Sequence, residues 1–265
     1  MANSFKVAAV QMNCVPFDVS RNLRLAEDLA ELASEKGAAL VVLPELFDTG
    51  YKVGEKDREL ASAIPGPTTD RLTALCRDRG IFIAGSIIEK DGESIYDTAF
   101  LTGPKGVVGT YRKNYLWGSE KERFSMGKDY AVFDVGFCKL GLQICYEVGF
   151  SEGARILALL GAEVIACPSA FGMPRLYAWD LASRARALEN GIYVIACNRS
   201  GNDGPDMIFA ANSRIVDPRG EILVSAGTEN DVVIVAEIDT RTVKQQREEL
   251  PYLKDLRRDL IADHI

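Results

Sequence analysis

The chain alternates short apolar runs with longer segments in which apolar residues recur every three or four positions. Runs such as AALVVLP (38–44) and IYVIACN (192–198) indicate buried strands, because strands covered on both faces read as continuous hydrophobic stretches. The spacing over 20–36 predicts a helix, with Ser20 or Asn22 as its N-cap and Gly37 as its stop. The same criteria predict strands over 5–12, 38–44, 81–88, 94–101, 106–112, 131–135, 139–145, 162–168, 192–198, 207–217, 221–226 and 231–238, helices over 20–36, 68–79, 151–161 and 175–190, and a charged, partly helical tail over 240–265.

Helices therefore alternate with strands, and hairpin-like strand pairs stand between them. This pattern predicts a layered α/β fold, although it does not give the order of the strands. The 265 residues contain no internal repeat, no low-complexity tract and no evident linker. We therefore expect one domain over 1–265.

The charge and composition of the chain limit the kinds of molecule that it is expected to bind. The net charge is -7 and no long basic run occurs, which argues against nucleic acid and anionic membranes as partners. The first residues lack the apolar core of a signal peptide, and the longest apolar stretch, ILALLGAEVIA, is interrupted by Glu163. Six cysteines without CxxC spacing favour reduced thiols and a cytoplasmic location. These are Cys14, Cys76, Cys138, Cys145, Cys167 and Cys197.

Histidine occurs once, as His264, next to the last residue. A serine–histidine–aspartate triad, a cysteine–histidine pair or a histidine-ligated zinc would have to use this one side chain, so all three are disfavoured. The stretch GPKGVVG (103–109) is not GxGxxG, and no GxxxxGK[ST] occurs. Nucleotide binding therefore has no support in the sequence.

Several reactive side chains follow predicted strands, where the sites of open α/β sheets gather. Glu45 follows LVVLP in LPELFDTGY (43–51), Lys113 follows GVVGTYR, and Cys145, Cys167 and Cys197 each end an apolar run. Ordinary alternatives exist: a capping carboxylate, a surface lysine, a cysteine that packs as a small hydrophobe. The local pattern does not choose among the three cysteines.

The missing histidine gives the carboxylate a possible role. A thiol that attacks a carbonyl or nitrile carbon needs a base and a group that stabilises the developing oxyanion. A carboxylate held at a buried strand end has a raised pKa, which suits it to accept the thiol proton. A nearby lysine ammonium can stabilise the oxyanion. A cysteine, a glutamate and a lysine would then form a hydrolase that needs no histidine.

Three blocks of the sequence resemble the nitrilase superfamily of carbon–nitrogen hydrolases. LPELFDTGY resembles the region of the general base, with Glu45 in its place; YRKNYLWGSEKERFSMG (111–127) resembles the lysine region, with Lys113; and GLQICYEVGFSE (141–152) resembles the nucleophile region, with Cys145. The second glutamate of the family, which braces the lysine, falls on Glu120, with Glu122 as the less favoured choice.

The resemblance implies an α-β-β-α sandwich that assembles as a dimer or larger, with residues 240–265 at a subunit interface. It implies that Cys145 attacks an amide carbon while Glu45 takes its proton. Lys113 and the backbone N–H of Tyr146 hold the oxyanion, and water hydrolyses the resulting thioester. It implies no metal and no organic cofactor.

The chain departs from the family pattern near two of these blocks. Tyr115 stands where many members carry histidine, and Glu147 and Val148 stand where many carry an aspartate and a following arginine. The run Cys145-Tyr146-Glu147 looks more like the amidase branches than the Cys-Trp-Glu run of many nitrilases. This favours an amide over a nitrile and leaves open how the loop after the nucleophile is held.

For the substrate we expect a small, linear, aliphatic amide, with a nitrile or an N-carbamoyl compound as the alternatives. Arg175 is the candidate for a substrate carboxylate. Two other classes remain open: a non-catalytic binding or scaffold protein on the same fold, and a thiol redox protein, which the missing CxxC disfavours. Aromatic side chains suited to a pocket wall are Tyr51, Trp117, Tyr146 and Phe171.

Overall fold

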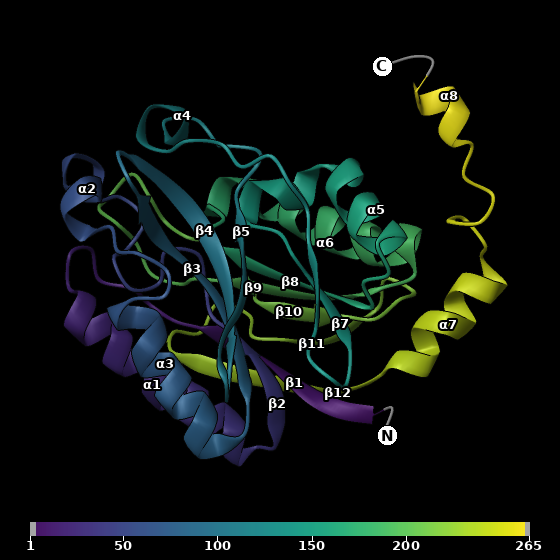
Figure 1. Ribbon diagram of the computed structural model, residues 1–265, viewed down its shortest axis with the longest axis horizontal. Coiled ribbons are helices and arrows are strands. Elements are labelled where there is room, and N and C mark those ends of the chain that lie inside the picture. The colour runs from purple at the N-terminus through teal and green to yellow at the C-terminus, as the bar shows by residue number, and fades with distance from the viewer. Residues whose placement is uncertain (1–3, 263–265) are drawn as a thin grey trace.

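The computed structural model describes residues 4–262, and the strands in this range pair into two six-stranded mixed sheets (Figure 1). The first sheet has the order β12-β1-β2-β3-β4-β5 and the second the order β11-β10-β9-β8-β7-β6. The strands of the first sheet are β1 (Ser4–Gln11), β2 (Ala38–Val42), β3 (Phe82–Asp91), β4 (Ser94–Gly103), β5 (Gly106–Arg112) and β12 (Val232–Asp239). Those of the second are β6 (Val132–Asp134), β7 (Lys139–Leu142), β8 (Val164–Ser169), β9 (Tyr193–Asn198), β10 (Arg214–Val216) and β11 (Ile222–Ser225).

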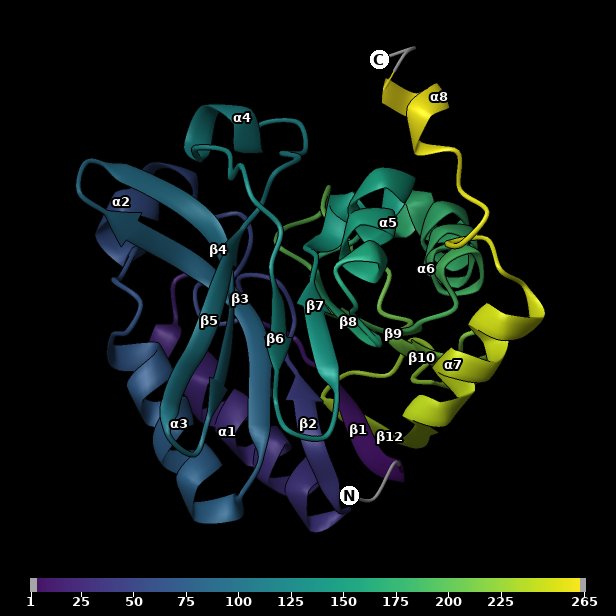
Figure 2. The same ribbon diagram turned by 45° about the vertical axis from the view of Figure 1, so that its right-hand side comes forward.

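Helices cover the outer face of each sheet. Helices α1 (Val19–Glu35) and α3 (Pro67–Arg79) lie on the first sheet, and α5 (Ser151–Leu159) and α6 (Leu176–Asn190) lie on the second (Figures 1 and 2). The expected α-β-β-α sandwich is confirmed. The shorter helices are α2 (Asp57–Leu60), α4 (Glu120–Arg123), α7 (Thr240–Glu249) and α8 (Arg258–Ala262), with single 3₁₀ turns at Gly54–Lys56, Cys145–Gly149 and Met173–Arg175.

Strand alternation builds the core. In β1, Val7 and Ala9 face the second sheet, whereas Ala8 and Val10 face the covering helices. Successive side chains of a strand point to opposite faces, so one short apolar run fills two layers at once. A third apolar layer, which includes Trp179, lies between the second sheet and its helices.

The helix boundaries follow from capping. Asp18 caps α1 by accepting a hydrogen bond from the Arg21 N–H at 3.1 Å, so the predicted caps were wrong. Ser20 lies inside the helix, and the buried Asn22 side chain bonds neighbouring backbone instead. Helix α3 begins on Pro67, whose fixed φ suits a first helical position.

Two predicted strands are shorter than the apolar runs suggest. Strand β7 ends at Leu142, three residues before Cys145. The predicted strand 207–217 was wrong over most of its length, because only Arg214–Val216 is a strand. Ala211 and Asn212 adopt φ values of 52° and 53°, which no strand accommodates.

The two sheets share one arrangement. In each, three neighbouring strands run parallel, β1-β2-β3 in the first and β7-β8-β9 in the second. The loops after these strands meet at one end of the sandwich, where the Glu45 N–H donates to the Ser169 carbonyl and the Ser200 N–H donates to the Met12 carbonyl. Within residues 4–262, no helix combines the length and hydrophobicity needed to cross a membrane.

Candidate active site

A buried lysine lies where these loops meet. Lys113 directly follows β5, and its Nζ lies 2.5 Å from Glu45 Oε1, 2.9 Å from Glu120 and 3.4 Å from Asp97 Oδ2. Glu45, Asp97 and Lys113 are fully buried, and Glu120 is 1% exposed. The first sheet and its loops therefore hold one ammonium among three carboxylates, away from water.

Further hydrogen bonds fix the three carboxylates. Glu45 Oε2 accepts the backbone N–H of Ala170 at 2.8 Å. Asp97 Oδ1 accepts the Ser86 hydroxyl at 2.9 Å. Glu120 accepts the Tyr51 hydroxyl at 2.5 Å and the Trp117 N–H at 2.8 Å. The set is pre-organised, since each carboxylate contacts both the ammonium and a second donor.

The cluster holds one lysine and three carboxylates, and burial shifts the pKa values of several of these groups. Burial raises the pKa of Glu45 well above its usual range, although the Lys113 ammonium opposes this effect. Burial also raises the pKa of Asp97. Burial alone would lower the pKa of Lys113, but the surrounding carboxylates outweigh it and raise that pKa well above its usual range. The lysine stays charged, and Glu45 and Asp97 bind protons more readily than free carboxylates do.

These three carboxylates are also the residue types of a metal site, and one oxygen from each lies within 4.8 Å of the others. The Lys113 ammonium contacts all three, so the charge a cation would supply is already present. We assign no metal to this cluster.

Cys145 approaches the same cluster from the second sheet. It begins the 3₁₀ turn after β7 and has a φ of 48°, a left-handed conformation that non-glycine residues rarely adopt. Burial raises the pKa of its thiol well above the usual range, the Glu45 charge adds to this effect, and Lys113 opposes it. The resting thiol is therefore protonated.

Glu147 fastens the nucleophile turn to the lysine loop. Its Oε1 accepts the Tyr111 hydroxyl at 2.6 Å and the backbone N–H groups of Asn114 at 2.8 Å and Tyr115 at 3.2 Å. Its Oε2 accepts the Ile144 N–H at 2.7 Å, directly before Cys145. Burial raises the pKa of Glu147 to about 7, although these donors lower it.

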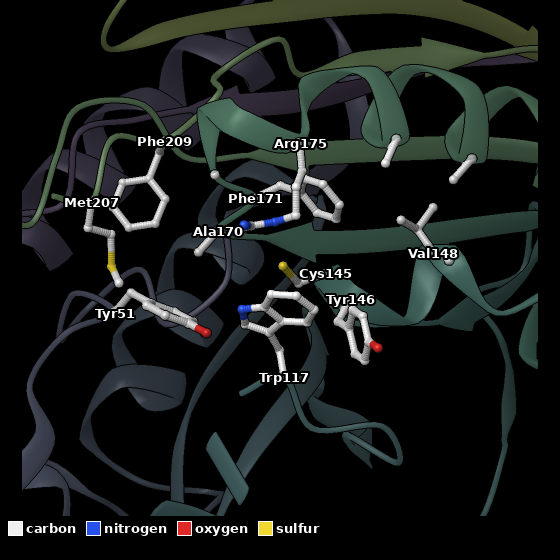
Figure 3. Close-up of a pocket in the computed structure, with 14 residues that line it drawn as sticks. Tyr51, Trp117, Cys145, Tyr146, Val148, Ala170, Phe171, Arg175, Met207 and Phe209 are labelled. Atoms are coloured by element: carbon white, nitrogen blue, oxygen red, sulfur yellow. The ribbon is translucent and has the colours of Figure 1, made fainter. Parts of the chain in front are cut away.

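A pocket opens directly over Cys145, with a volume of about 180 Å³ (Figure 3). Its walls come from loops of both sheets, and most of them are aromatic or aliphatic. The four aromatic residues proposed from the sequence all line it. The lining residues are Tyr51, Trp117, Cys145, Tyr146, Val148, Gly149, Ala170, Phe171, Gly172, Arg175, Ala178, Ala182, Met207 and Phe209.

A buried ion pair supports one side of this pocket. Arg199 and Asp203 form two hydrogen bonds, at 3.0 and 2.9 Å, and both side chains are buried. Asp203 also accepts the backbone N–H of Tyr51 at 3.1 Å, and the Arg199 guanidinium lies 4.0 Å from the ring centre of Phe209. One pair thus positions two aromatic wall residues from separate loops.

Comparison with known proteins identifies the family. The model for carbon–nitrogen hydrolases matches residues 6–248. The chain belongs to the carbon–nitrogen hydrolase family. It is 44% identical over 246 residues to a nitrilase of Pyrococcus abyssi, covering 91% of this chain and 92% of that protein. It is 37% identical over 268 residues to an omega-amidase of Xenopus laevis, covering 97% and 96%.

Solved structures agree with this assignment to the nitrilase superfamily. An amidase from Nesterenkonia sp. superposes with a TM-score of 0.88 at 30% identity, over 100% of this chain and 98% of that chain. For the Nesterenkonia sp. AN1 amidase of the nitrilase superfamily, one mutant structure is a complex with butyramide. Another mutant shows covalent addition of the acetamide moiety of fluoroacetamide at the active site cysteine.

Within the carbon–nitrogen hydrolase fold, the structure separates the sequence candidates. Cys145 lies in the pocket beside the charged cluster, whereas Cys167 and Cys197 are fully buried in the apolar core. Glu120 contacts Lys113, and Glu122 is exposed. His264 lies outside the described residues.

The structure also shows the contacts of the three residues that depart from the family pattern. Tyr115, in the position of the family histidine, stacks on Phe150 with ring centres 4.0 Å apart. Glu147 takes the four hydrogen bonds that hold the nucleophile turn, so a carboxylate is kept where aspartate is common. Val148 is buried and lines the pocket.

Sequence reasoning missed several members of this site. The sequence pattern places Asp97 in an ordinary strand, although a lone acidic residue inside the apolar run SIYDTAFL is a usable signal of a buried functional group. Ala170 contributes its backbone N–H, which no side-chain motif reveals. Met207 and Phe209 were assigned to a strand and lie instead in a pocket loop.

Proposed function

We propose that this protein hydrolyses the C–N bond of a small, aliphatic amide to a carboxylic acid and ammonia through a cysteine thioester. The observation that carries the proposal is the position of Cys145 at the pocket wall, in reach of the charges of Glu45 and Lys113. A protonated thiol, a carboxylate of raised pKa and a fixed ammonium supply a nucleophile, a base and an oxyanion stabiliser.

In the first half of the reaction, Cys145 Sγ bonds to the amide carbon while its proton passes to Glu45. The carbonyl oxygen becomes an oxyanion, which Lys113 Nζ and the backbone N–H of Tyr146 stabilise. Glu45 then gives its proton to the amide nitrogen, the C–N bond breaks, and ammonia leaves. A thioester on Cys145 remains.

In the second half, Glu45 takes a proton from water, and the water oxygen bonds to the thioester carbon. The carbon–sulfur bond then breaks, the thiolate recovers the proton from Glu45, and the acid leaves. Glu120 and Asp97 act by positioning, because both contact the lysine that Glu45 also contacts. The enzyme returns to its starting protonation state after each turnover.

The experiment that tests this proposal measures ammonia release from small amides, N-carbamoyl compounds and nitriles. We expect release by the native protein and none by Cys145→Ala, with Cys167→Ala and Cys197→Ala as matched controls that keep activity. Added hydroxylamine should divert the thioester to a hydroxamate. Activity that survives Cys145→Ala but not Cys167→Ala would contradict the assignment of the nucleophile. A native protein that releases no ammonia and whose Cys145 resists electrophiles would be a non-catalytic binding protein.

A nitrile is the second candidate substrate, and the 44% identity to the nitrilase of Pyrococcus abyssi favours it. The same panel separates the two candidates. A nitrilase converts nitriles faster than the matched amides, and an amidase does the reverse.

We also propose that the chain assembles as a homodimer or larger, with residues 240–265 at the subunit interface. Beyond α7 the described chain runs away from the sandwich (Figure 1), and Leu250, Tyr252 and Leu260 are exposed on it. A second copy would bury these apolar side chains. Sedimentation of the full chain and of a chain ending at residue 250 tests this: the truncated chain should dissociate at concentrations where the full chain does not.

A further inference from the structure

Asp97 is a buried carboxyl of the charged cluster that takes no proton in the proposed reaction. It lies inside β4, and its backbone carbonyl accepts the Lys113 N–H at 3.0 Å, directly after β5. Its Oδ2 lies 3.4 Å from Lys113 Nζ, and one of its oxygens lies within 4.8 Å of an oxygen of Glu45 and of Glu120. Asp97 therefore faces the base directly.

The cluster contains more acidic groups than its single ammonium can balance. Were Glu45, Asp97 and Glu120 all ionised, Lys113 would leave two negative charges in a site that has almost no exposed surface. Excess charge of one sign is costly in an apolar interior, and neighbouring carboxylates avoid this cost by sharing a proton. At least one proton is therefore bound among the three carboxylates.

The hydrogen bonds indicate which carboxylate holds this proton. Glu120 accepts two further donors besides the ammonium, and Glu45 accepts a backbone N–H as well as the closest contact of Lys113. Asp97 has the longest contact with the ammonium, and its other oxygen accepts the neutral Ser86 hydroxyl. A carboxylate that receives weaker donors loses less when it is protonated. Burial also raises the pKa of Asp97, although Lys113 opposes this effect.

We propose that Asp97 holds a proton in the resting protein and donates it in a hydrogen bond to Glu45, which stays ionised and able to act as a base. This inference rests on the proposed function and assigns a positioning residue to its reaction. When Glu45 takes the thiol proton, each of the two carboxyls holds one proton until the departing nitrogen receives that of Glu45. The other titratable groups that face this pair are Lys113, Glu120 and, from the second sheet, Cys145.

An asparagine in place of Asp97 mimics the protonated carboxyl. It has the shape of aspartate, and its amide N–H donates to Glu45 as a neutral carboxyl does. Asp97→Asn should keep kcat and KM for butyramide within about threefold of the native values. The acidic limb of the pH profile of kcat/KM, which reports the ionisation of Glu45, should not move. Were Asp97 an anion, the substitution would remove a negative charge beside Glu45 and shift that limb by about one unit or more toward lower pH.

A leucine at the same position has a similar shape but offers no donor. Asp97→Leu should lower kcat about 30-fold with little change in KM, because ionised Glu45 loses a hydrogen bond. The acidic limb should move to higher pH for the same reason. Asp78→Asn, exposed on α3, is the matched control and should change neither kcat nor the limb.

An infrared measurement detects the proton without turnover, and it decides the inference if Asp97→Leu does not fold. The difference spectrum between the native protein and Asp97→Asn at neutral pH should contain the C=O stretch of a protonated carboxyl. The difference spectrum between the native protein and Asp78→Asn should not contain this band.

The possible outcomes separate this inference from the proposed function. Absence of the carboxyl band overturns the inference and leaves the proposed function standing. A shift of the acidic limb of Asp97→Asn to lower pH, or a loss of kcat as large as that of Asp97→Leu, also overturns it. A native protein that hydrolyses no amide of the panel overturns the proposed function and the role of Asp97 together, whatever the infrared spectrum shows.

Discussion

The two sheets of the sandwich have the same arrangement of strands but contribute different chemistry. The first sheet and its loops supply the buried charges, namely Glu45, Asp97 and Lys113. The second supplies the Cys145 turn, the Ala170 N–H and part of the apolar wall. The candidate site is complete only between the sheets, because Glu45 and Lys113 follow strands of the first sheet and Cys145 follows a strand of the second.

Two cysteines at equivalent places sharpen this contrast. Cys14 lies three residues after β1, and Cys145 lies three residues after β7. Cys14 is fully buried against Arg199, whose guanidinium donates to the Cys14 carbonyl at 2.6 Å, and burial raises its pKa to about 11. Cys145 lines the pocket beside Glu45. An equivalent position after a strand therefore does not by itself place a thiol at the pocket and beside a carboxylate.

The largest expected effect comes from replacing each of these two cysteines with serine. Cys145→Ser should lower kcat/KM by roughly 10⁴-fold or more, because the better nucleophile of the proposed thioester step is lost. Cys14→Ser should change kcat/KM by less than about threefold, because its thiol contacts no reacting group. Steady-state ammonia release from both variants measures the difference. A similar loss of kcat/KM in both variants would contradict the assignment of Cys145 alone as the nucleophile.

Removing the base tests the contribution of the first sheet. Glu45→Gln should lower kcat by roughly 10³-fold, within the range expected of a general base. The variant keeps Cys145 and the pocket, so a small electrophile should still label that thiol. Turnover and mass-spectrometric labelling are measured on one preparation. Labelling of the buried Cys167 and Cys197 would indicate a misfolded variant, whereas full turnover would exclude Glu45 as the base.

Glu147, which joins the two sheets' loops, should make stability depend on pH. Its pKa of about 7 in the folded protein exceeds the ordinary value of 4.5, so the folded state binds more protons between these values. The free energy of unfolding therefore falls as pH rises through this window, by up to about 3 kcal/mol from this group.

The Glu147→Gln variant should lack this component of the pH dependence. Urea unfolding of the native protein and the variant at pH 5 and pH 8 gives the comparison. The stability of the native protein relative to the variant should be greater at pH 5 than at pH 8. Parallel behaviour of the two proteins would show that Glu147 does not titrate in this range.

The smallest expected effect lies in the pocket wall. Asp203→Asn weakens the support of Tyr51 and Phe209 and should raise KM about tenfold, with a smaller change in kcat. Asp217→Asn is the matched control, because Asp217 also accepts backbone N–H groups but lies in the β10–β11 turn. Equal effects of the two substitutions would remove any special role for the Arg199–Asp203 pair.

Sequence reasoning reached the parts of this site that short blocks encode. Glu45, Lys113, Glu120 and Cys145 each lie within a contiguous motif, and the structure brings them close together. Asp97 was not found, because its role depends on the pairing of β4 with β5, which brings it next to Lys113. Strand periodicity does not report that pairing.

The sequence predicts the layers of the fold, but it does not predict that the two sheets share one arrangement of strands. No repeat is visible in the sequence, yet both sheets have three parallel strands followed by antiparallel ones. The two sheets can share backbone geometry and burial although their side chains differ. Their similarity is therefore seen in the structure and not in the sequence. The pattern wrongly predicts a strand over 207–213, because apolar residues of this loop, such as Met207 and Phe209, line the pocket.

The complete burial of the charged cluster has a consequence for how the catalytic cycle meets its surroundings. Glu45, Asp97 and Lys113 have no exposed surface, so no bulk water reaches the base directly. In the proposed cycle, a proton that Glu45 takes from the thiol is therefore shielded from the solvent until it passes to the departing nitrogen. If the proposed cycle holds, protons enter and leave this buried cluster with the substrate, water and products that pass through the pocket.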